Sequence, residues 1–382
     1  MTRATPLAAG SFLTHSSNPT HTSNRTHTSG HSVSPGFEDY GYDGLPGNPM
    51  LAAGLYETRM AVLAGAEPPV LGGPQDLGAA RDWAGLPSRL PLQEDPDALF
   101  QAAAKPRWGT LMFELLSGSG FACAPQAHGG SATLSLDSGD PAAPLTITMS
   151  RPPRACFEAQ LPRVVAQVSV RDRRYTEVLT QVGPPLAYYG AVVGLQTERH
   201  RRTLELIALA LDFAYPIVMR FKHALACPRP SAYSSVVQPM IEVPGHASLP
   251  AGHATEGHIV ATLLSALVPG AAVREPLRHL RRVAARIADN RIVAGLHFPV
   301  DNVAGQLLGD ALAQYLLARC GAPNAASSVQ FNGADPQLAQ AGPVDADAAL
   351  FAVPGCSVVK AVAVQVNDLL YPLWRQAEAE WH

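Results

Sequence analysis

The sequence is poor in lysine and in charged residues altogether. Lysine and arginine number 28 together, and only Lys105, Lys222 and Lys360 are lysines. Charged residues make up 15% of the 382 residues, and the formal net charge is −3. Proteins that bind nucleic acid usually carry a dense basic surface. We therefore expect no nucleic-acid partner.

Cysteine is scarce too, and its spacing is irregular. The five cysteines are scattered along the chain, and none forms a Cys-x-x-Cys pair. This pattern argues against a zinc cage or a disulfide framework and favours a reducing compartment. The apolar run at the N-terminus is too short and broken for a signal peptide. We therefore expect a cytoplasmic protein, and the sequence is compatible with a homo-oligomer.

Long apolar runs are also missing. The most apolar stretches are 204–221, which contains Glu205 and Asp212, and 259–273, which is broken at Pro269-Gly270. A membrane-spanning helix needs about 20 consecutive, predominantly apolar residues. We expect both stretches to form buried helices, and we expect no membrane association.

The chain divides into three parts by composition. Residues 1–36 form a low-complexity arm rich in His, Ser and Thr, and 37–150 form an irregular cover. In this cover we expect helices over 49–64 and 96–116 and a β-hairpin over 131–150. Residues 151–382 are expected to form an all-α helical bundle in which 321–357 are mostly loop. The expected helices of this bundle are 158–181, 186–195, 201–225, 254–268, 274–295, 300–319 and 359–379.

Two segments of this bundle place basic or titratable groups at helix ends. In "KHALACPRP", Lys222 ends an apolar helix and Arg229 follows it. On their own, these cations would simply complement the negative end of the helix dipole. In "SLPAGHATEGH", Gly252 and His253 begin a new helix, whose free N–H groups can bind an anion. On its own, His253 could equally be a capping or buried histidine.

The third segment is "NRIVAGLHFPVDN", with Arg291, His297 and Asp301. The His-x-x-x-Asp spacing brings a carboxylate within reach of an imidazole, which fixes the tautomer and raises the basicity of the other ring nitrogen. Asp301 alone could instead serve only the dipole of its helix. Taken together, the three segments predict a pocket for a doubly charged tetrahedral oxyanion.

These motifs resemble the three-part signature of the superfamily of vanadium haloperoxidases and type 2 phosphatidic acid phosphatases. The resemblance covers roughly residues 204–317 and rests on matched residues in three blocks: Lys222 and Arg229-Pro230, then Pro250 and Gly252-His253, then Arg291, His297 and Asp301. The sequence departs from the family at two others. Ala251 stands where the family has an anion-binding serine, and Asn290 stands where a serine usually precedes the last arginine. Ser248 could supply a hydroxyl, but we expect its side chain to point elsewhere.

The resemblance implies a peroxidase as the first hypothesis. Vanadate, the implied cofactor, would be bonded to His297 and held by Lys222, Arg229, Gly252 and Arg291. Lys222 would polarise hydrogen peroxide, and His253 would handle a proton. Bromide-oxidising members resemble this chain in carrying a histidine at the position of His246, which is therefore a candidate halide site, although it could also be an ordinary loop histidine. The implied partners are hydrogen peroxide, a halide and a small organic acceptor.

Two other hypotheses stay open. In a soluble acid phosphatase, His297 would be the nucleophile, Asp301 would orient it, and His253 would protonate the leaving alcohol. With Ala251 and Asn290, the pocket could also be a weakly active oxyanion-binding site. The length of the chain and the absence of apolar spans favour the haloperoxidase, because the membrane phosphatases have several spans and the soluble ones are much shorter.

Overall fold

The computed structural model describes residues 99–382, except 101, 125–129, 184, 269–273, 323–325, 343–345 and 347–350. Of residues 274–277 it describes the backbone but not the side chains. The expected arm over 1–36 and the expected helix over 49–64 lie outside the described residues. No helix in this part of the chain is both long and apolar enough to cross a membrane.

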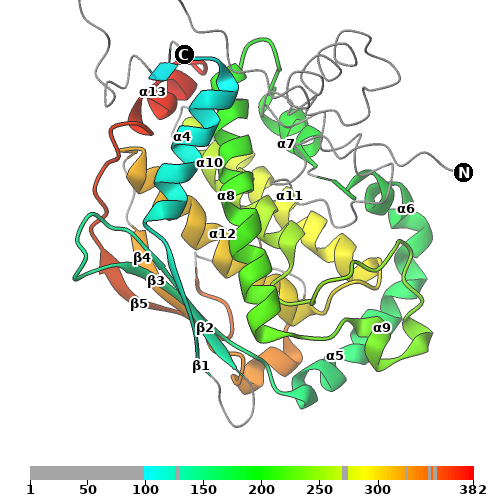
Figure 1. Ribbon diagram of the computed structural model, residues 1–382. Coiled ribbons are helices and arrows are strands. Elements are labelled where there is room, and N and C mark those ends of the chain that lie inside the picture. The colour runs from blue at the N-terminus through cyan, green and yellow to red at the C-terminus, as the bar shows by residue number, and fades with distance from the viewer. Residues whose placement is uncertain are drawn as a thin grey trace, which may run out of the picture.

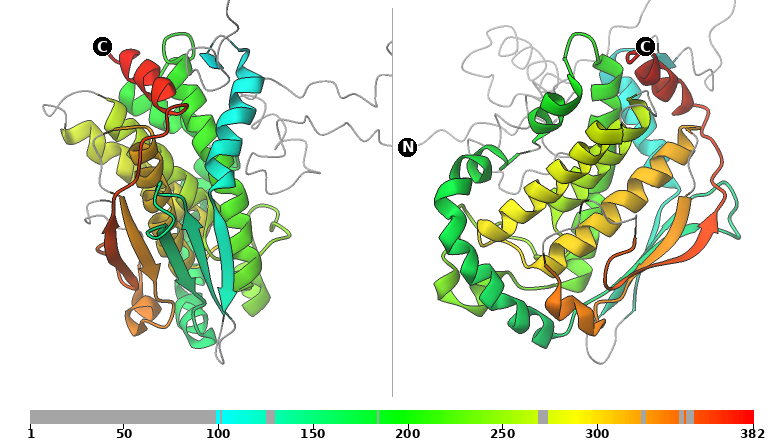
Figure 2. Two further views of the ribbon diagram at one scale, coloured as in Figure 1. Left: turned by 60° about the vertical axis from the view of Figure 1, so that its left-hand side comes forward. Right: turned by 180° about the vertical axis from the view of Figure 1, so that it is seen from behind.

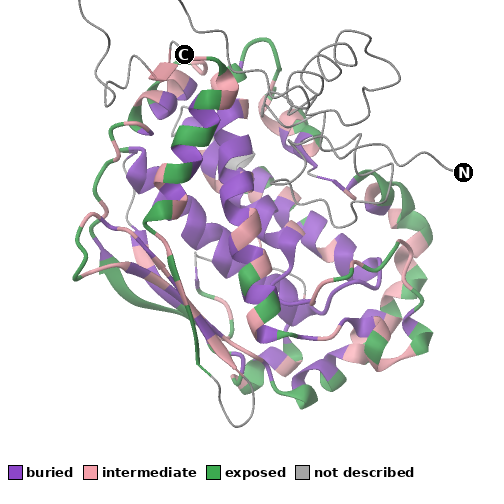
Figure 3. Cartoon of the chain, in the orientation of Figure 1, coloured by how far each residue is buried: buried purple, intermediate pink, exposed green. Residues whose placement is uncertain are grey.

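Three long helices form the centre of the molecule (Figure 1). They are α8 (Arg201–Leu225), α10 (Gly252–Leu267) and α12 (Pro299–Arg319). Every residue of α12 is buried, because α10 covers one side of it and the sheet covers another (Figure 3). A fourth long helix, α11 (Arg274–Val293), packs on α10.

Shorter helices surround this centre. Among them, α4 (Ala104–Ser117) and α13 (Tyr371–Ala379) pack on α8, whereas α6 (Arg171–Thr180) and α7 (Leu186–Val193) pack on α11. The remaining elements are α5 (Arg154–Ala166), α9 (Pro230–Tyr233) and the 3-10 turns η3 (Gln167–Val170), η4 (Ser235–Val237) and η5 (Pro336–Gln340).

The expectation of an all-α fold is wrong in one respect. The molecule is mainly helical, but the described residues also contain a five-stranded mixed sheet in the order β1-β2-β3-β4-β5, seen at the edge of the helical layer in Figure 2. The expected hairpin corresponds to β2 (Ser131–Leu136) and β3 (Leu145–Ser150). The other strands are β1 (Gly120–Ala124), β4 (Ala326–Phe331) and β5 (Cys356–Val362).

The sheet covers the bundle with one face. Side chains of β2 and β3 alternate between buried and half-buried, as expected for strands that pack one face against a core. β4 pairs in parallel with β3 after the whole helical core has intervened, and β5 returns antiparallel to β4. A sequence window around 321–357 contains no sign of this long-range pairing, so its loop-like composition was misleading.

The expected helices agree with the structure best in the central region. The ranges expected for α8, α10, α11 and α12 differ from the observed ends by at most two residues. The single helix expected over 158–181 is divided into α5, η3 and α6. The helix expected over 359–379 is correct only for α13, because 356–362 form β5.

Close contact between α10 and α12 fixes the position of the future site. Two glycines of α12, Gly305 and Gly309, lie against the backbone oxygens of Ala251 and Thr255 on α10, and a Cβ at either position would clash with them. The absence of a side chain thus lets the two helices approach closely. As a result, the N-terminal ends of α10 and α12 meet, and the Ala251 N–H donates to the Asp301 carbonyl at 2.9 Å.

A buried ion pair joins α4 to the central helix. Arg107 Nε donates to Glu205 Oε1 at 2.6 Å, and both side chains are almost fully buried. Replacing Glu205 with Ala would leave the Arg107 charge buried, at a cost of about 3–5 kcal/mol in the free energy of unfolding. We expect a large loss in denaturant titration. Breaking the exposed pair Arg201–Glu198 with Glu198→Ala should change this free energy by less than about 1 kcal/mol. Equal effects of the two substitutions would contradict this account.

Candidate oxyanion-binding site

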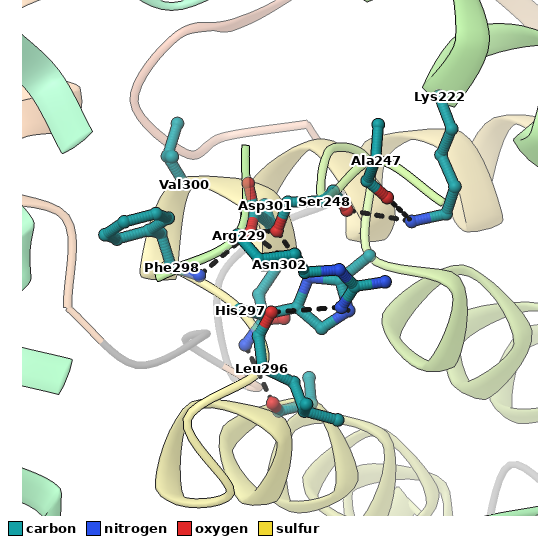
Figure 4. Close-up of polar contacts among 12 residues, drawn as sticks. Lys222, Arg229, Ala247, Ser248, Leu296, His297, Phe298, Val300, Asp301 and Asn302 are labelled. Atoms are coloured by element: carbon teal, nitrogen blue, oxygen red, sulfur yellow. Dashed lines mark hydrogen bonds and ion pairs between the residues drawn. The ribbon is translucent and has the colours of Figure 1, made fainter. Parts of the chain in front are cut away.

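The structure brings the sequence-predicted residues together around the ends of four elements. Lys222 lies in the last turn of α8, Arg291 in the last turn of α11, His253 in the first turn of α10 and Asp301 in the first turn of α12. Arg229, His246 and His297 come from the connecting loops, and Figure 4 shows the region around Arg229, His297 and Asp301.

His297 and Asp301 form a buried dyad. His297 Nδ1 lies 3.1 Å from Asp301 Oδ2, and the same oxygen accepts from the Phe298 N–H at 2.8 Å. Asp301 therefore both caps α12 and contacts the imidazole. It is at once the helix-terminal residue and the imidazole partner that the sequence offered as alternatives. Because Nδ1 faces a carboxylate, it carries the proton, and the lone pair is left on Nε2. Burial, followed by the charges of Arg229 and Lys222, lowers the pKa of His297 well below its ordinary value.

The hydroxyl of Ser248 contacts both members of this dyad, a contact that the sequence did not predict. Its hydroxyl donates to Asp301 Oδ2 at 2.5 Å and lies 3.2 Å from His297 Nδ1. The hydroxyl is thus on the Nδ1 side of the ring and does not take the place of the serine that the family has at Ala251. Only its nearness to the proline-glycine turn could have marked Ser248 in the sequence.

Lys222 and Arg229 are buried and bound by neutral acceptors. Lys222 Nζ donates to the carbonyls of Ala247 and Ser248, at 3.0 and 2.8 Å. Arg229 Nη1 donates to the Leu296 carbonyl at 3.0 Å and to His297 Nε2 at 3.1 Å. Burial lowers the pKa of Arg229 to about 10, so it stays charged at neutral pH. Burial and then the charge of Arg229 lower the pKa of Lys222.

Arg291 provides the clearest test of whether these residues fit an oxyanion. Its side chain is 1% exposed, and Nη2 donates to the Val178 carbonyl at 3.0 Å. Among the described residues, neither Nε nor Nη1 has a hydrogen-bond partner. Buried guanidinium nitrogens rarely stay unsatisfied, and the oxygens of a tetrahedral anion are acceptors of the kind that they lack. The donor set therefore fits phosphate or vanadate.

The two remaining histidines lie at the edges of this group. His253 Nε2 lies 2.8 Å from the Gln181 carbonyl and 3.1 Å from that of Val182, which makes Nε2 the protonated nitrogen. Burial and then the charge of Arg291 lower the pKa of His253 to about 3. His246 Nδ1 accepts from Arg229 Nη2 at 3.2 Å, and burial and then Lys222 lower the pKa of His246 to about 3. Both rings are therefore neutral in this structure.

The structure also accounts for the two departures from the family pattern. Ala251 is completely buried and packs in a cluster with Ala254, Ala285 and Ala288. Asn290 is tied to α6: its Oδ1 accepts from Arg174 at 2.8 Å, and its Nδ2 donates to Gln181 Oε1 at 2.8 Å and to Glu177 Oε2 at 2.9 Å. Gly252 is the buried first residue of α10.

Glu177 gives this network a pH dependence. The pKa of Glu177 is lowered from 4.5 to about 2. The hydrogen bond from Arg286 is the largest cause, burial acts in the opposite direction, and the hydrogen bond from Asn290 lowers the pKa further. A lowered folded-state pKa means that the stabilisation is fully present above pH 4.5 and is lost as the pH falls towards 2. We expect Glu177→Gln to lower Tm at pH 7, and the difference from the unsubstituted protein to shrink between pH 5 and about pH 3. Glu158→Gln, on an exposed pair with Arg154, is the control. A difference that stays constant with pH would contradict this assignment.

Comparison with known proteins matches one region of the chain. Residues 204–321, from α8 to the end of α12, match the model of the PAP2 superfamily. All seven predicted oxyanion-site and catalytic residues lie within this region, and so does the halide candidate His246. No curated protein matches the whole chain or part of it significantly.

Proposed function

Residues 204–321 form a PAP2 superfamily domain, a superfamily that includes vanadium haloperoxidases and PAP2 phosphatases, and from this premise we propose that the protein is a peroxidase of the vanadium haloperoxidase type. It would oxidise a halide, with bromide favoured, by means of hydrogen peroxide at a vanadate held by His297. The small organic acceptor of the oxidised halide would be its further partner.

One observation carries the oxyanion part of this proposal. Two nitrogens of the buried Arg291 have no hydrogen-bond partner in the part of the chain that the structure describes, and the site also contains Lys222 and Arg229. Asp301 is the nearby carboxylate, but no carboxylate of the described residues hydrogen-bonds to these three side chains. Burying this much basic character is unfavourable unless a ligand supplies negative charge. A doubly charged tetrahedral anion provides that charge and enough oxygens for several donors.

The residues of the chain have separate tasks. Asp301 and Ser248 hold the Nδ1 side of His297, so that the Nε2 lone pair can bond the central atom of the anion. Lys222, Arg229 and Arg291 would bind its oxygens, and His253 would receive or donate a proton at the opposite side. Bound vanadate supplies a Lewis acid that activates hydrogen peroxide without changing its own oxidation state.

The preference for peroxidase over phosphatase rests on His246, because His253 would exchange a proton in either reaction. His246, bonded to Arg229, gives a second neutral imidazole beside the site, as expected for the bromide-oxidising members.

Paired assays distinguish the candidate functions. We expect protein loaded with orthovanadate to brominate a dye in the presence of hydrogen peroxide, and His297→Ala to lower this rate at least about 100-fold because the bond to vanadate is lost. Phosphatase activity in the vanadate-free protein, inhibited by added vanadate, would instead support the phospho-histidine enzyme. Neither activity, with no effect of His297→Ala on anion binding, would contradict both.

Ser248 allows a second, milder test of the dyad. We expect Ser248→Ala to lower the rate of the active reaction by about 10–100-fold, because outer-shell partners of a ligating histidine have effects of this size. Ser248→Thr keeps the hydroxyl and should retain more activity. Circular dichroism checks that both variants fold. An Ala variant as active as the unsubstituted protein would show that Asp301 alone orients His297.

A further inference from the structure

The C-terminal end of α6 lies directly on the oxyanion-binding side chains. The Val178 carbonyl accepts from Arg291 Nη2 at 3.0 Å. The carbonyls of Gln181 and Val182, immediately after the helix, accept from His253 Nε2 at 2.8 and 3.1 Å. Arg291 and His253 are thus both bonded to oxygens of one short segment, 178–182.

These carbonyls have the chemistry of anion oxygens. The last four carbonyls of a helix have no partner within it, and they form the negative end of its dipole. An oxyanion would present oxygens of the same kind, with more negative charge, to the same nitrogens. The segment 178–182 and a bound oxyanion therefore compete for at least Arg291 Nη2 and His253 Nε2.

Asn290 holds this segment in place. Its Nδ2 donates to Gln181 Oε1, and Gln181 is the residue whose carbonyl contacts His253. Its Oδ1 accepts from Arg174, one turn earlier in α6. A serine, the usual family residue here, has one hydroxyl on a shorter side chain and cannot make all of these contacts. Asn290 and Arg291 are adjacent, so one turn of α11 both holds the segment 178–182 and supplies a side chain of the anion site.

We propose that the end of α6, pinned by Asn290, is a built-in cap that occupies anion-contacting nitrogens and is displaced when an oxyanion binds. Asn290 is a positioning residue in this arrangement: it acts on the affinity through Gln181 and touches no reactant. The inference rests on the proposed function only in requiring that the site binds an oxyanion, and it holds for peroxidase and phosphatase alike.

The cap lowers the apparent affinity by the fraction of molecules in which it is closed. If the anion binds only the open form, the apparent Kd equals the intrinsic Kd divided by the open fraction. Removing one hydrogen bond from the closed form raises a small open fraction by roughly tenfold. The effect of an Asn290 substitution should therefore appear as tighter binding, whereas a merely structural loss would weaken binding.

Calorimetric titration with orthovanadate, and separately with inorganic phosphate, tests this expectation. We expect Asn290→Ala and Gln181→Ala each to lower Kd by roughly tenfold. The matched control is Arg171→Ala, which breaks hydrogen bonds to the Val237, Gln238 and Val293 carbonyls at the opposite end of α6. The control should leave Kd within about twofold. Unchanged or weaker binding in both Asn290→Ala and Gln181→Ala would overturn the proposal.

Hydrogen exchange of the unsubstituted protein gives a second, independent readout. We expect saturating vanadate to speed amide exchange in 175–183, because the cap leaves its partners, and to slow exchange in the first turn of α10. Slower or unchanged exchange in 175–183 would mean that the anion binds beneath an undisturbed cap, which overturns the proposal while leaving the oxyanion site intact. If neither the unsubstituted protein nor Asn290→Ala binds vanadate or phosphate, the cap and the proposed function both fail.

Discussion

The structure depends on keeping three basic side chains away from water beside a single histidine-carboxylate dyad. Lys222, Arg229 and Arg291 are 1%, 6% and 1% exposed. Burying a charged group costs free energy, and burying it without hydrogen-bond partners costs more. Backbone carbonyls that accept hydrogen bonds from Lys222 and Arg229 offset much of this cost. The carboxylate of the dyad is buried as well, and burial raises the pKa of Asp301 to about 6.

Such a site is built for a ligand with more negative charge than carbonyls carry. Carbonyl dipoles satisfy hydrogen bonds but leave net positive charge uncompensated, whereas a dianion compensates it at once. At Nε and Nη1 of Arg291, no carbonyl of the described residues accepts a hydrogen bond. The histidines are neutral here because burial, and then the neighbouring basic groups, lower the pKa of each imidazole.

The predicted site residues lie together in the structure, whereas the predicted fold class is wrong in part, because the two depend on different kinds of information. Fixed spacings such as His297-x-x-x-Asp301 report contacts within one turn of a helix, and so did the periodicity that predicted α8 and α12. The pairing of β3 with β4 joins two strands that are separated in the sequence by the whole helical core, and no local pattern encodes it. The roles of Ser248 and of segment 178–182 likewise depend on long-range packing, which one sequence alone does not reveal.

The two departures from the family pattern change meaning once the packing is known. From the sequence, Ala251 and Asn290 each look like the loss of a hydroxyl and hence of anion affinity. In the structure, Ala251 fills a cluster of small side chains between α10 and α11, where a hydroxyl would need a partner. Asn290 exchanges one hydroxyl for an amide with three contacts to α6. Where the family has a serine hydroxyl, the chain thus has an amide whose hydrogen bonds go to the protein, and the proposed cap depends on these bonds.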